Sequence, residues 1–238
     1  MYRIGIDLGG TNIAVGLVSD ELRIVKKLST PTLAKRPAQE IVADMASLCE
    51  RLCAEQGIEI ADLESIGIAA PGMINSVDGV VEYSNNIPLR KFPIVAILRD
   101  TLGTDIPISV ANDANAAAWG EACAGAAKGT KNSIMVTLGT GVGGGIIIDG
   151  KLYTGFNCAG GELGHTVLVV DGVPCSCGRR GCWEAYSSAT ALIRMTNEKL
   201  EECAASGRKT VMTELVEKSG KASGRTAFDA MRAGDEAG

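Results

Sequence analysis

The sequence predicts an α/β protein made of two halves, residues 1–110 and 111–238. Strand-like runs open each half, and helical periodicity follows them. In each half, a glycine-rich turn lies between two adjacent β-rich runs. We therefore expect an N-terminal α/β domain over 1–110 and a C-terminal α/β domain over 111–238.

The first half reads as strands around one amphipathic helix. The β-rich runs are "YRIGID", "NIAVGLVS", "RIVKKLS" and "ESIGIAA", the last ending in the turn "PG". Between the third and fourth runs, apolar side chains recur at helical spacing up to Gly57, which predicts a helix with one buried face. These side chains are Ile41, Val42, Met45, Leu48, Cys49, Leu52 and Cys53.

The second half begins where the strand "PISVA" feeds a helix, "DANAAAWGEACAGAA". The runs "NSIMVTL" and "GGGIIIDG" predict a strand pair, and two further helices are expected over "SATALIRMTNEKLEECAAS" and "TAFDAMRAG". Asp235 in the final "DEAG" resembles a helix N-cap with no helix after it. We therefore expect the second domain to be incomplete at its C-terminus.

Composition limits the partners and the compartment. The 238 residues carry a net charge of −5 and no basic run, which disfavours nucleic acid as a partner. The sequence shows neither a signal peptide nor an apolar run of about 18 residues, so we expect no membrane association and a cytoplasmic location. In a reducing compartment, the eight cysteines are expected to be thiols or metal ligands.

The two glycine-rich turns predict phosphate binding. In "DLGGT", Gly9 and Gly10 allow backbone amides to approach an anion, and Thr11 adds a hydroxyl donor. Asp7 can hold Mg²⁺ through a water molecule; the alternative is a simple hairpin with a capping aspartate. The second turn, "GTGVGGG" over 139–145, fits neither a P-loop nor a dinucleotide-binding motif. One such turn in each half is typical of the actin-like ATPases, which clamp a nucleotide between two domains.

Asn112 and Asp113 stand where a predicted strand meets a predicted helix. One interpretation is an ordinary helix N-cap. The other is a carboxylate at the interdomain cleft that accepts a proton from a hydroxyl group.

The only histidine, His165, lies close in sequence to Cys175, Cys177 and Cys182. One nitrogen and three sulfurs form the Cys₃His set of a structural zinc site; the alternative is three reduced thiols and an unrelated histidine. Glu162 and Glu184 flank this stretch. They are either solvated surface charges or carboxylates held in place to bind the hydroxyls of a sugar.

Taken together, these motifs resemble the ROK family of sugar kinases and repressors. The resemblance rests on "DLGGTNIAVG", "AAPGMINSVDG", "VANDANAAAWGE", "TLGTGVGGGII", "AGGELGHTVL" and "CSCGRRGCWEAYSS". It implies an actin-like ATPase (ribonuclease H-like) two-domain fold with a small zinc-binding knot. The chain starts directly at the first strand, without the helix-turn-helix of the repressor branch.

The resemblance also implies roles for individual residues, with Asp113 as the catalytic base. The implied sugar-binding residues are Gly72, Asn85, Asn86, Asn112, Asp113, Glu162, His165 and Glu184. The implied ATP-binding residues are Asp7, Gly9, Gly10, Thr11, Asn12, Gly139, Thr140, Gly141 and Gly143. The implied metal ligands are His165, Cys175, Cys177 and Cys182 for structural Zn²⁺, with Asp7 for the Mg²⁺ of Mg-ATP through water. Two departures stand out: the stretch "SNNIPLR" lacks a tryptophan that family members often carry near the sugar, and a further C-terminal adenosine-binding segment is missing.

We therefore expect a cytoplasmic homodimer that phosphorylates a hexose with ATP, glucose being the first choice. N-acetylmannosamine, N-acetylglucosamine, fructose and allose are alternative substrates. A non-catalytic sugar sensor and an actin- or Hsp70-like ATPase are the alternatives of other classes. The phosphate turns and Asp113 argue against the sensor, and the predicted zinc knot argues against the ATPase.

Overall fold

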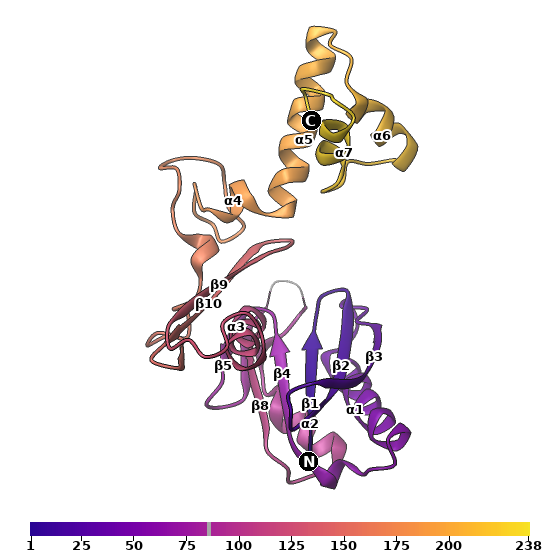
Figure 1. The fold of residues 1–238 in the computed structure, drawn as a ribbon, viewed down its shortest axis with the longest axis vertical. Coiled ribbons are helices and arrows are strands. Elements are labelled where there is room, and N and C mark those ends of the chain that lie inside the picture. Colours follow the sequence, from indigo (N-terminus) through magenta and orange to yellow (C-terminus); the bar gives the residue numbers. More distant parts are fainter. Residues whose placement is uncertain (85–86) are drawn as a thin grey trace. The chain divides into compact units, whose positions relative to one another are not determined.

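The computed structural model describes residues 1–84 and 87–238 (Figure 1). Two compact units emerge. Unit 1 consists of Met1–Met135 and Gly145–Gly161, and unit 2 of Val136–Gly144 and Glu162–Gly238. These units divide the chain differently from the expected halves, because residues 111–135 and 145–161 lie with unit 1. The domain boundary at residue 110 stays a prediction.

Unit 1 is built on a five-stranded sheet with the order β3-β2-β1-β4-β8. Its strands are β1 (Tyr2–Leu8), β2 (Asn12–Ser19), β3 (Ile24–Pro31), β4 (Leu63–Ala70) and β8 (Ile108–Asn112). The pairs β1–β2 and β2–β3 are antiparallel, whereas β1–β4 and β4–β8 are parallel. The carboxyl ends of β1, β4 and β8 therefore meet at one edge of the sheet.

Helix α1 (Ala38–Glu55) buries the apolar face that its sequence predicts, and Gly57 follows its end with φ +69°. Helix α2 (Ile94–Leu102) was not expected from the sequence; it contacts α1 and β8. Side chains such as Ile4, Met45 and Leu98 form the main hydrophobic core, whose buried members all lie within residues 4–110.

Unit 1 contains several shorter elements, of which β5 and β6 contribute Ile74 and Val81 to this core. A short 3₁₀ turn, η1 (Ile60–Asp62), precedes β4. A small antiparallel sheet joins β5 (Met73–Asn75), β6 (Val80–Tyr83) and β7 (Arg90–Phe92). The predicted sugar contacts Asn85 and Asn86 fall between β6 and β7, outside the described residues. Helix α3 (Asp113–Ala124) is shorter than expected because it ends at Gly125.

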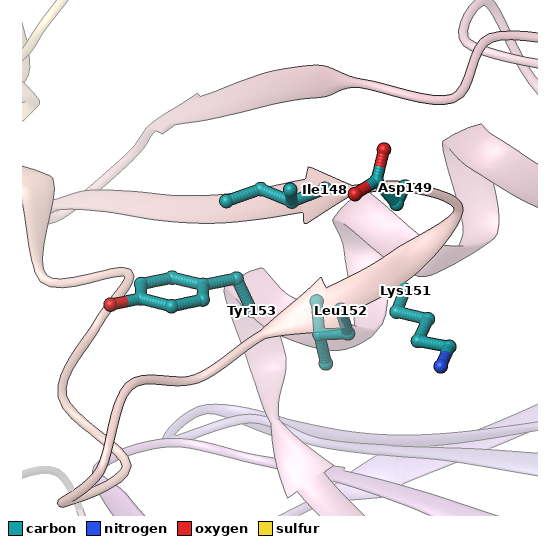
Figure 2. Close-up of a pocket in the computed structure, with 5 residues that line it drawn as sticks. All are labelled: Ile148, Asp149, Lys151, Leu152 and Tyr153. Atoms are coloured by element: carbon teal, nitrogen blue, oxygen red, sulfur yellow. The ribbon is translucent and has the colours of Figure 1, made fainter.

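A third sheet has the order β11-β10-β9. Its strands are β9 (Ser133–Leu138), β10 (Val142–Ile148) and β11 (Lys151–Tyr153). Asp149 and Gly150 join β10 to β11 with φ values of +50° and +73°, as a tight two-residue hairpin requires (Figure 2). The shallow hollow beside this hairpin is lined by Ile148, Asp149, Lys151, Leu152 and Tyr153, none of which the sequence singles out as a site residue (Figure 2).

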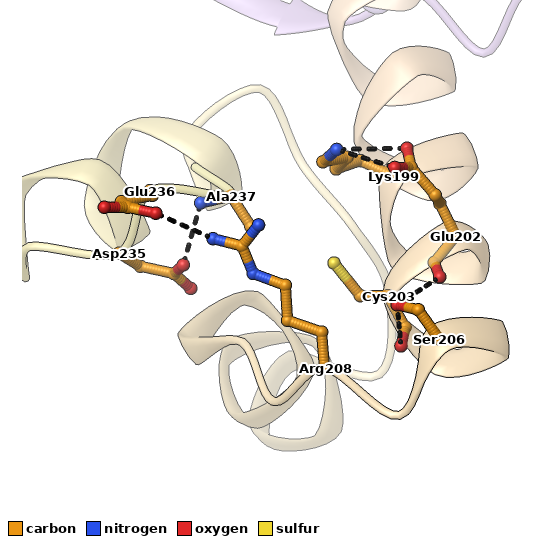
Figure 3. Close-up of polar contacts among 8 residues, drawn as sticks. All are labelled: Lys199, Glu202, Cys203, Ser206, Arg208, Asp235, Glu236 and Ala237. Atoms are coloured by element: carbon orange, nitrogen blue, oxygen red, sulfur yellow. Dashed lines mark hydrogen bonds and ion pairs between the residues drawn. The ribbon is translucent and has the colours of Figure 1, made fainter.

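Unit 2 is mostly helical. Besides the end of β9 and the start of β10, its elements are η2 (Leu163–His165), α4 (Glu184–Ser187), α5 (Ala189–Ser206), α6 (Val211–Ser219) and α7 (Thr226–Arg232). Asp235 makes the N-cap-type contact that its sequence suggests, because its carboxylate accepts a hydrogen bond from the Ala237 amide at 2.9 Å. The same carboxylate also accepts hydrogen bonds from the hydroxyl of Thr210 and the amide of Val211, at the start of α6. An ion pair between Arg208 and Glu236 lies close by (Figure 3). Within the described part of the chain, no helix is long and apolar enough to cross a membrane.

Candidate functional site

The first glycine-rich turn is held in place by a residue that the sequence did not single out. The hydroxyl of Thr32 donates to the carbonyl of Gly9 at 2.6 Å, and the Thr32 amide donates to the carbonyl of Thr11 at 2.8 Å. Thr32 is fully buried. A Cβ atom at Gly9 would lie 2.9 Å from the carbonyl oxygen of Asn12, so the turn needs glycine there. The two hydrogen bonds of Thr32 and the close approach of the Asn12 carbonyl therefore fix the backbone of this turn.

Two aspartates stand at the edge where the parallel strands end. Asp7 pairs in register with Ala69 of β4, and Asp113 follows the last residue of β8. Desolvation raises the pKa of Asp7, and the charge of Asp113 raises it further. Desolvation also raises the pKa of Asp113, although the Ala114 amide donates to its carboxylate at 2.9 Å and opposes the shift. Both carboxylates remain accessible to solvent, which leaves them open to a ligand.

The side chain of Asn112 caps helix α3, as one of the two interpretations expected. Its Oδ1 accepts from the amides of Ala114 at 3.0 Å and Asn115 at 3.2 Å. Its Nδ2 donates to the carbonyl of Gly72 at 3.1 Å. Asn112 thus fixes both the start of α3, where Asp113 lies, and the backbone of Gly72.

Gly72 has no room for a side chain. Its φ of +104° is unfavourable for other residues, and a Cβ there would collide with the carbonyl of Tyr83. The "PG" turn after β4 therefore lies against the end of β6, with the Gly72 carbonyl turned to Asn112.

In unit 2, the second glycine-rich turn contacts Glu184. The Glu184 carboxylate accepts a hydrogen bond from the amide of Val142 at 3.0 Å. A Cβ at Gly141 would collide with the same carboxylate, so a larger residue at Gly141 would displace Glu184. The predicted phosphate turn and one predicted sugar-binding carboxylate are therefore in direct contact.

The motif Glu162-Leu163-Gly164-His165 (E-x-G-H) also approaches Val142. A Cβ at Gly164 would collide with the carbonyl of Val142. Glycine is thus required in the motif because the β10 backbone passes directly over it. Val142 lies between Glu184, which binds its amide, and Gly164, which packs against its carbonyl.

The four predicted metal ligands come together. The ligand atoms of His165, Cys175, Cys177 and Cys182 all lie within 4.8 Å of one another. The sulfurs of Cys177 and Cys182 are 3.7 Å apart, and Nδ1 of His165 is 3.6 Å from the Cys175 sulfur. Tetrahedral zinc with ordinary bond lengths requires edges of about 3.8 Å between sulfurs and about 3.5 Å between sulfur and nitrogen. These two separations fit a tetrahedral metal site.

Electrostatics around these thiols also favour a cation. Burial opposes ionisation of Cys177, but hydrogen bonds from the backbone and guanidinium of Arg179 and from the neighbouring thiols lower the pKa of Cys177 to about 6. Burial raises the pKa of Cys182 to about 11. Zinc binds the thiolate form of cysteine, and the positive charge of a bound zinc ion would stabilise the thiolate of Cys182.

The loop that carries these ligands is tied down by side chains. Arg179 donates to the carbonyl of His165 at 2.9 Å, and the hydroxyl of Tyr186 accepts from the amide of Val173 at 2.8 Å. On the other ring nitrogen of His165, Nε2 lies 4.0 Å from a carboxylate oxygen of Glu162. Glu162 is thus a neighbour of the metal ligand His165.

The structure accordingly gathers the candidate residues in two sets. Unit 1 holds the first turn with Asp7, Gly72, Asn112 and Asp113, and unit 2 holds the second turn with Glu162, Glu184 and the four metal ligands. Sequence patterns missed Thr32 and Tyr186, since a single threonine or tyrosine far from a motif carries no local signal.

Comparisons with known proteins identify the family of this chain. The sequence matches the ROK family over residues 3–235. It is 38% identical to a glucokinase of Thermotoga maritima, over 98% of this chain and 70% of the relative. It is 43% identical to a glucokinase of Streptomyces coelicolor, over 82% of this chain and 59% of the relative. A solved structure, a ROK family glucokinase from Streptomyces griseus in complex with glucose and AMPPNP, is 37% identical with a TM-score of 0.78. That comparison covers 100% of this chain and 73% of the other.

The fold and its structural neighbours define the class: an α/β chain with the actin-like ATPase fold of sugar kinases. Within that class, the chain belongs to the ROK family. It spans between 59% and 70% of the length of the two glucokinases named above.

Proposed function

We propose that this protein is an ATP-dependent hexose kinase that converts glucose to glucose 6-phosphate. The similarity to a glucokinase that binds glucose and AMPPNP carries this proposal, because it extends over the full chain. Both glycine-rich turns and the Asn112–Asp113 junction are present here, and hydrogen bonds hold their backbones. The retained aspartate favours a kinase over a sugar sensor.

In this proposal, Asp113 is the general base. Its carboxylate accepts the proton of the sugar 6-hydroxyl while that oxygen bonds to the γ-phosphorus and the bond from phosphorus to the bridging oxygen of ADP breaks. The cap by Asn112 holds the carboxylate at a fixed place at the start of α3. Its raised pKa brings its basicity closer to that of the group it deprotonates.

Nucleotide and sugar would be held by the residues that the family motifs assign. The turns at Asp7–Asn12 and Gly139–Gly143 would bind the phosphates. Asp7 would hold the Mg²⁺ of Mg-ATP through water, and that ion would supply positive charge against the phosphates. The sugar hydroxyls are bound by Gly72, Asn85, Asn86, Asn112, Glu162, His165 and Glu184. In the described structure, Asn112 already uses its amide in capping, so it acts chiefly by fixing Asp113 and Gly72.

A structural zinc ion completes the proposal for unit 2. His165, Cys175, Cys177 and Cys182 supply four protein ligands, which leaves no open position for chemistry. The ion would fix the segment between Glu162 and Glu184. We also propose a cytoplasmic homodimer without nucleic acid or membrane partners, and retain the expected domains, 1–110 and 111–238.

A coupled ADP-release assay over a panel of sugars tests the proposal. We expect turnover with glucose above N-acetylmannosamine, N-acetylglucosamine, fructose and allose, and none with Asp113→Asn. Turnover that is highest with another sugar would reassign the substrate. Calorimetric binding of glucose without any ADP release would reject the kinase and favour a sugar sensor.

A further inference from the structure

The second glycine-rich turn is fastened to the start of helix α5 by two hydrogen bonds. The amide of Ala189 donates to the carbonyl of Gly139 at 2.8 Å. The hydroxyl of Thr190 donates to the carbonyl of Thr140 at 2.8 Å. All four residues belong to unit 2. Two successive carbonyls of the turn thus point to the same helix end.

This fastening fixes the direction of the amide groups. In a trans peptide, the C=O and N–H bonds point in opposite directions, and the structure has no cis peptide among its described residues. The carbonyls of Gly139 and Thr140 share their peptide planes with the amides of Thr140 and Gly141. Both amides must therefore point away from α5.

Neither of these two amides has a hydrogen-bond partner among the described residues. The next amide, that of Val142, is already bound to Glu184. Adjacent unpaired N–H groups with a common direction form a favourable contact for a phosphate oxygen. The turn is therefore oriented for an anion before any ligand arrives.

We propose that Thr190 is a positioning residue for the nucleotide: its hydroxyl holds the Thr140 carbonyl back so that the Gly141 amide faces a phosphate group. This inference rests on the proposed nucleotide site at residues 139–143. Thr190 touches neither the metal ligands nor Glu184 in the described hydrogen bonds. Its effect should therefore fall on the nucleotide and not on the sugar.

The test uses Thr190→Val, which keeps the shape and removes the donor, and Thr190→Ser, which restores it. Thr101→Val is the matched control, because Thr101 is also exposed and its hydroxyl also donates to a backbone carbonyl, that of Ile97 at 2.7 Å. Binding of Mg-AMPPNP and of glucose would be measured by calorimetry for each protein. Steady-state constants for ATP and glucose would be measured in parallel.

We expect Thr190→Val to weaken Mg-AMPPNP binding roughly fivefold and to raise the KM for ATP by a similar factor, as for the loss of one hydrogen bond. Glucose affinity should be unchanged, and Thr190→Ser should bind the nucleotide as the wild type does. Unchanged nucleotide affinity in Thr190→Val, or an equal loss in Thr101→Val, would overturn the role of Thr190 alone. A wild-type protein that binds no Mg-AMPPNP would instead reject the nucleotide site, and this inference with it.

Discussion

Desolvation disfavours the charged form of Asp113, and the start of helix α3 holds this residue in place. Replacing it with asparagine keeps the shape but removes the proton acceptor, so we expect turnover to fall by about 10²- to 10⁴-fold. Glucose binding should persist, because the amide can still form hydrogen bonds. The coupled assay and glucose calorimetry on Asp113→Asn check both parts; retention of more than about a tenth of the activity would remove Asp113 from the role of base.

The raised pKa values of Asp7 and Asp113 also predict how stability depends on pH. For both carboxyls, desolvation raises the pKa in the folded state above the ordinary value of an aspartate, so the folded state binds the proton more tightly than the unfolded state. Their contribution to stability is therefore fully present below about pH 3.8 and is lost as pH rises through the folded-state pKa. We expect Asp113→Asn to melt at a higher temperature than the wild type at pH 7, and the difference to shrink towards pH 4.

Melting curves of Asp113→Asn and the wild type between pH 4 and pH 7 test this prediction. A difference that is constant with pH would mean that the asparagine acts through packing instead of through the lost charge.

Among the elements, the turn that carries Gly164 depends on the close approach of strand β10. A Cβ at Gly164 would collide with the Val142 carbonyl, so Gly164→Ala should displace β10 or the motif. We expect a loss of about 1–3 kcal/mol in the free energy of unfolding of unit 2, as is common for overpacking. Denaturant unfolding measures it. Gly224→Ala in the same unit is the control, because a Cβ there meets nothing within 4 Å; an equal loss in both variants would contradict this account.

Most regular elements could be predicted from the sequence because their apolar periodicity is strong, as in α1 and in β1 and β2. Helices α2 and α6 were missed. Their length does not explain this, because α7 is shorter and was expected; α2 depends on its contacts with α1 and β8, which the local sequence does not reveal. The metal ligands were predictable because His165 and the cysteines stand close in sequence. The hydrogen bonds from Thr32 and Thr190 to the two glycine-rich turns were not predictable, because only the fold brings these threonines to the turns.

At the scale of the whole molecule, the two units differ in what can stabilise them. The main core lies within residues 4–110 and contains large side chains such as Ile4, Leu17 and Leu52. The buried apolar residues of unit 2 are fewer and mostly small. They are Val142, Cys182, Ala191, Cys203, Met212, Ala222 and Ala230. Unit 2 therefore has less hydrophobic stabilisation and more to gain from a metal ion.

This contrast predicts two separate responses to loss of the metal. A structural zinc ion contributes its binding free energy to folding, so a chelator should lower the melting temperature of unit 2 by about 10 °C or more and leave that of unit 1 nearly unchanged. Cys177→Ser should reproduce the effect without a chelator, whereas Cys123→Ser, a free thiol outside the cluster, should not. Calorimetry gives the transitions, and hydrogen exchange assigns each to a unit. Metal analysis showing no zinc in the purified protein, or equal shifts of both transitions, would contradict the role of the metal as the support of unit 2.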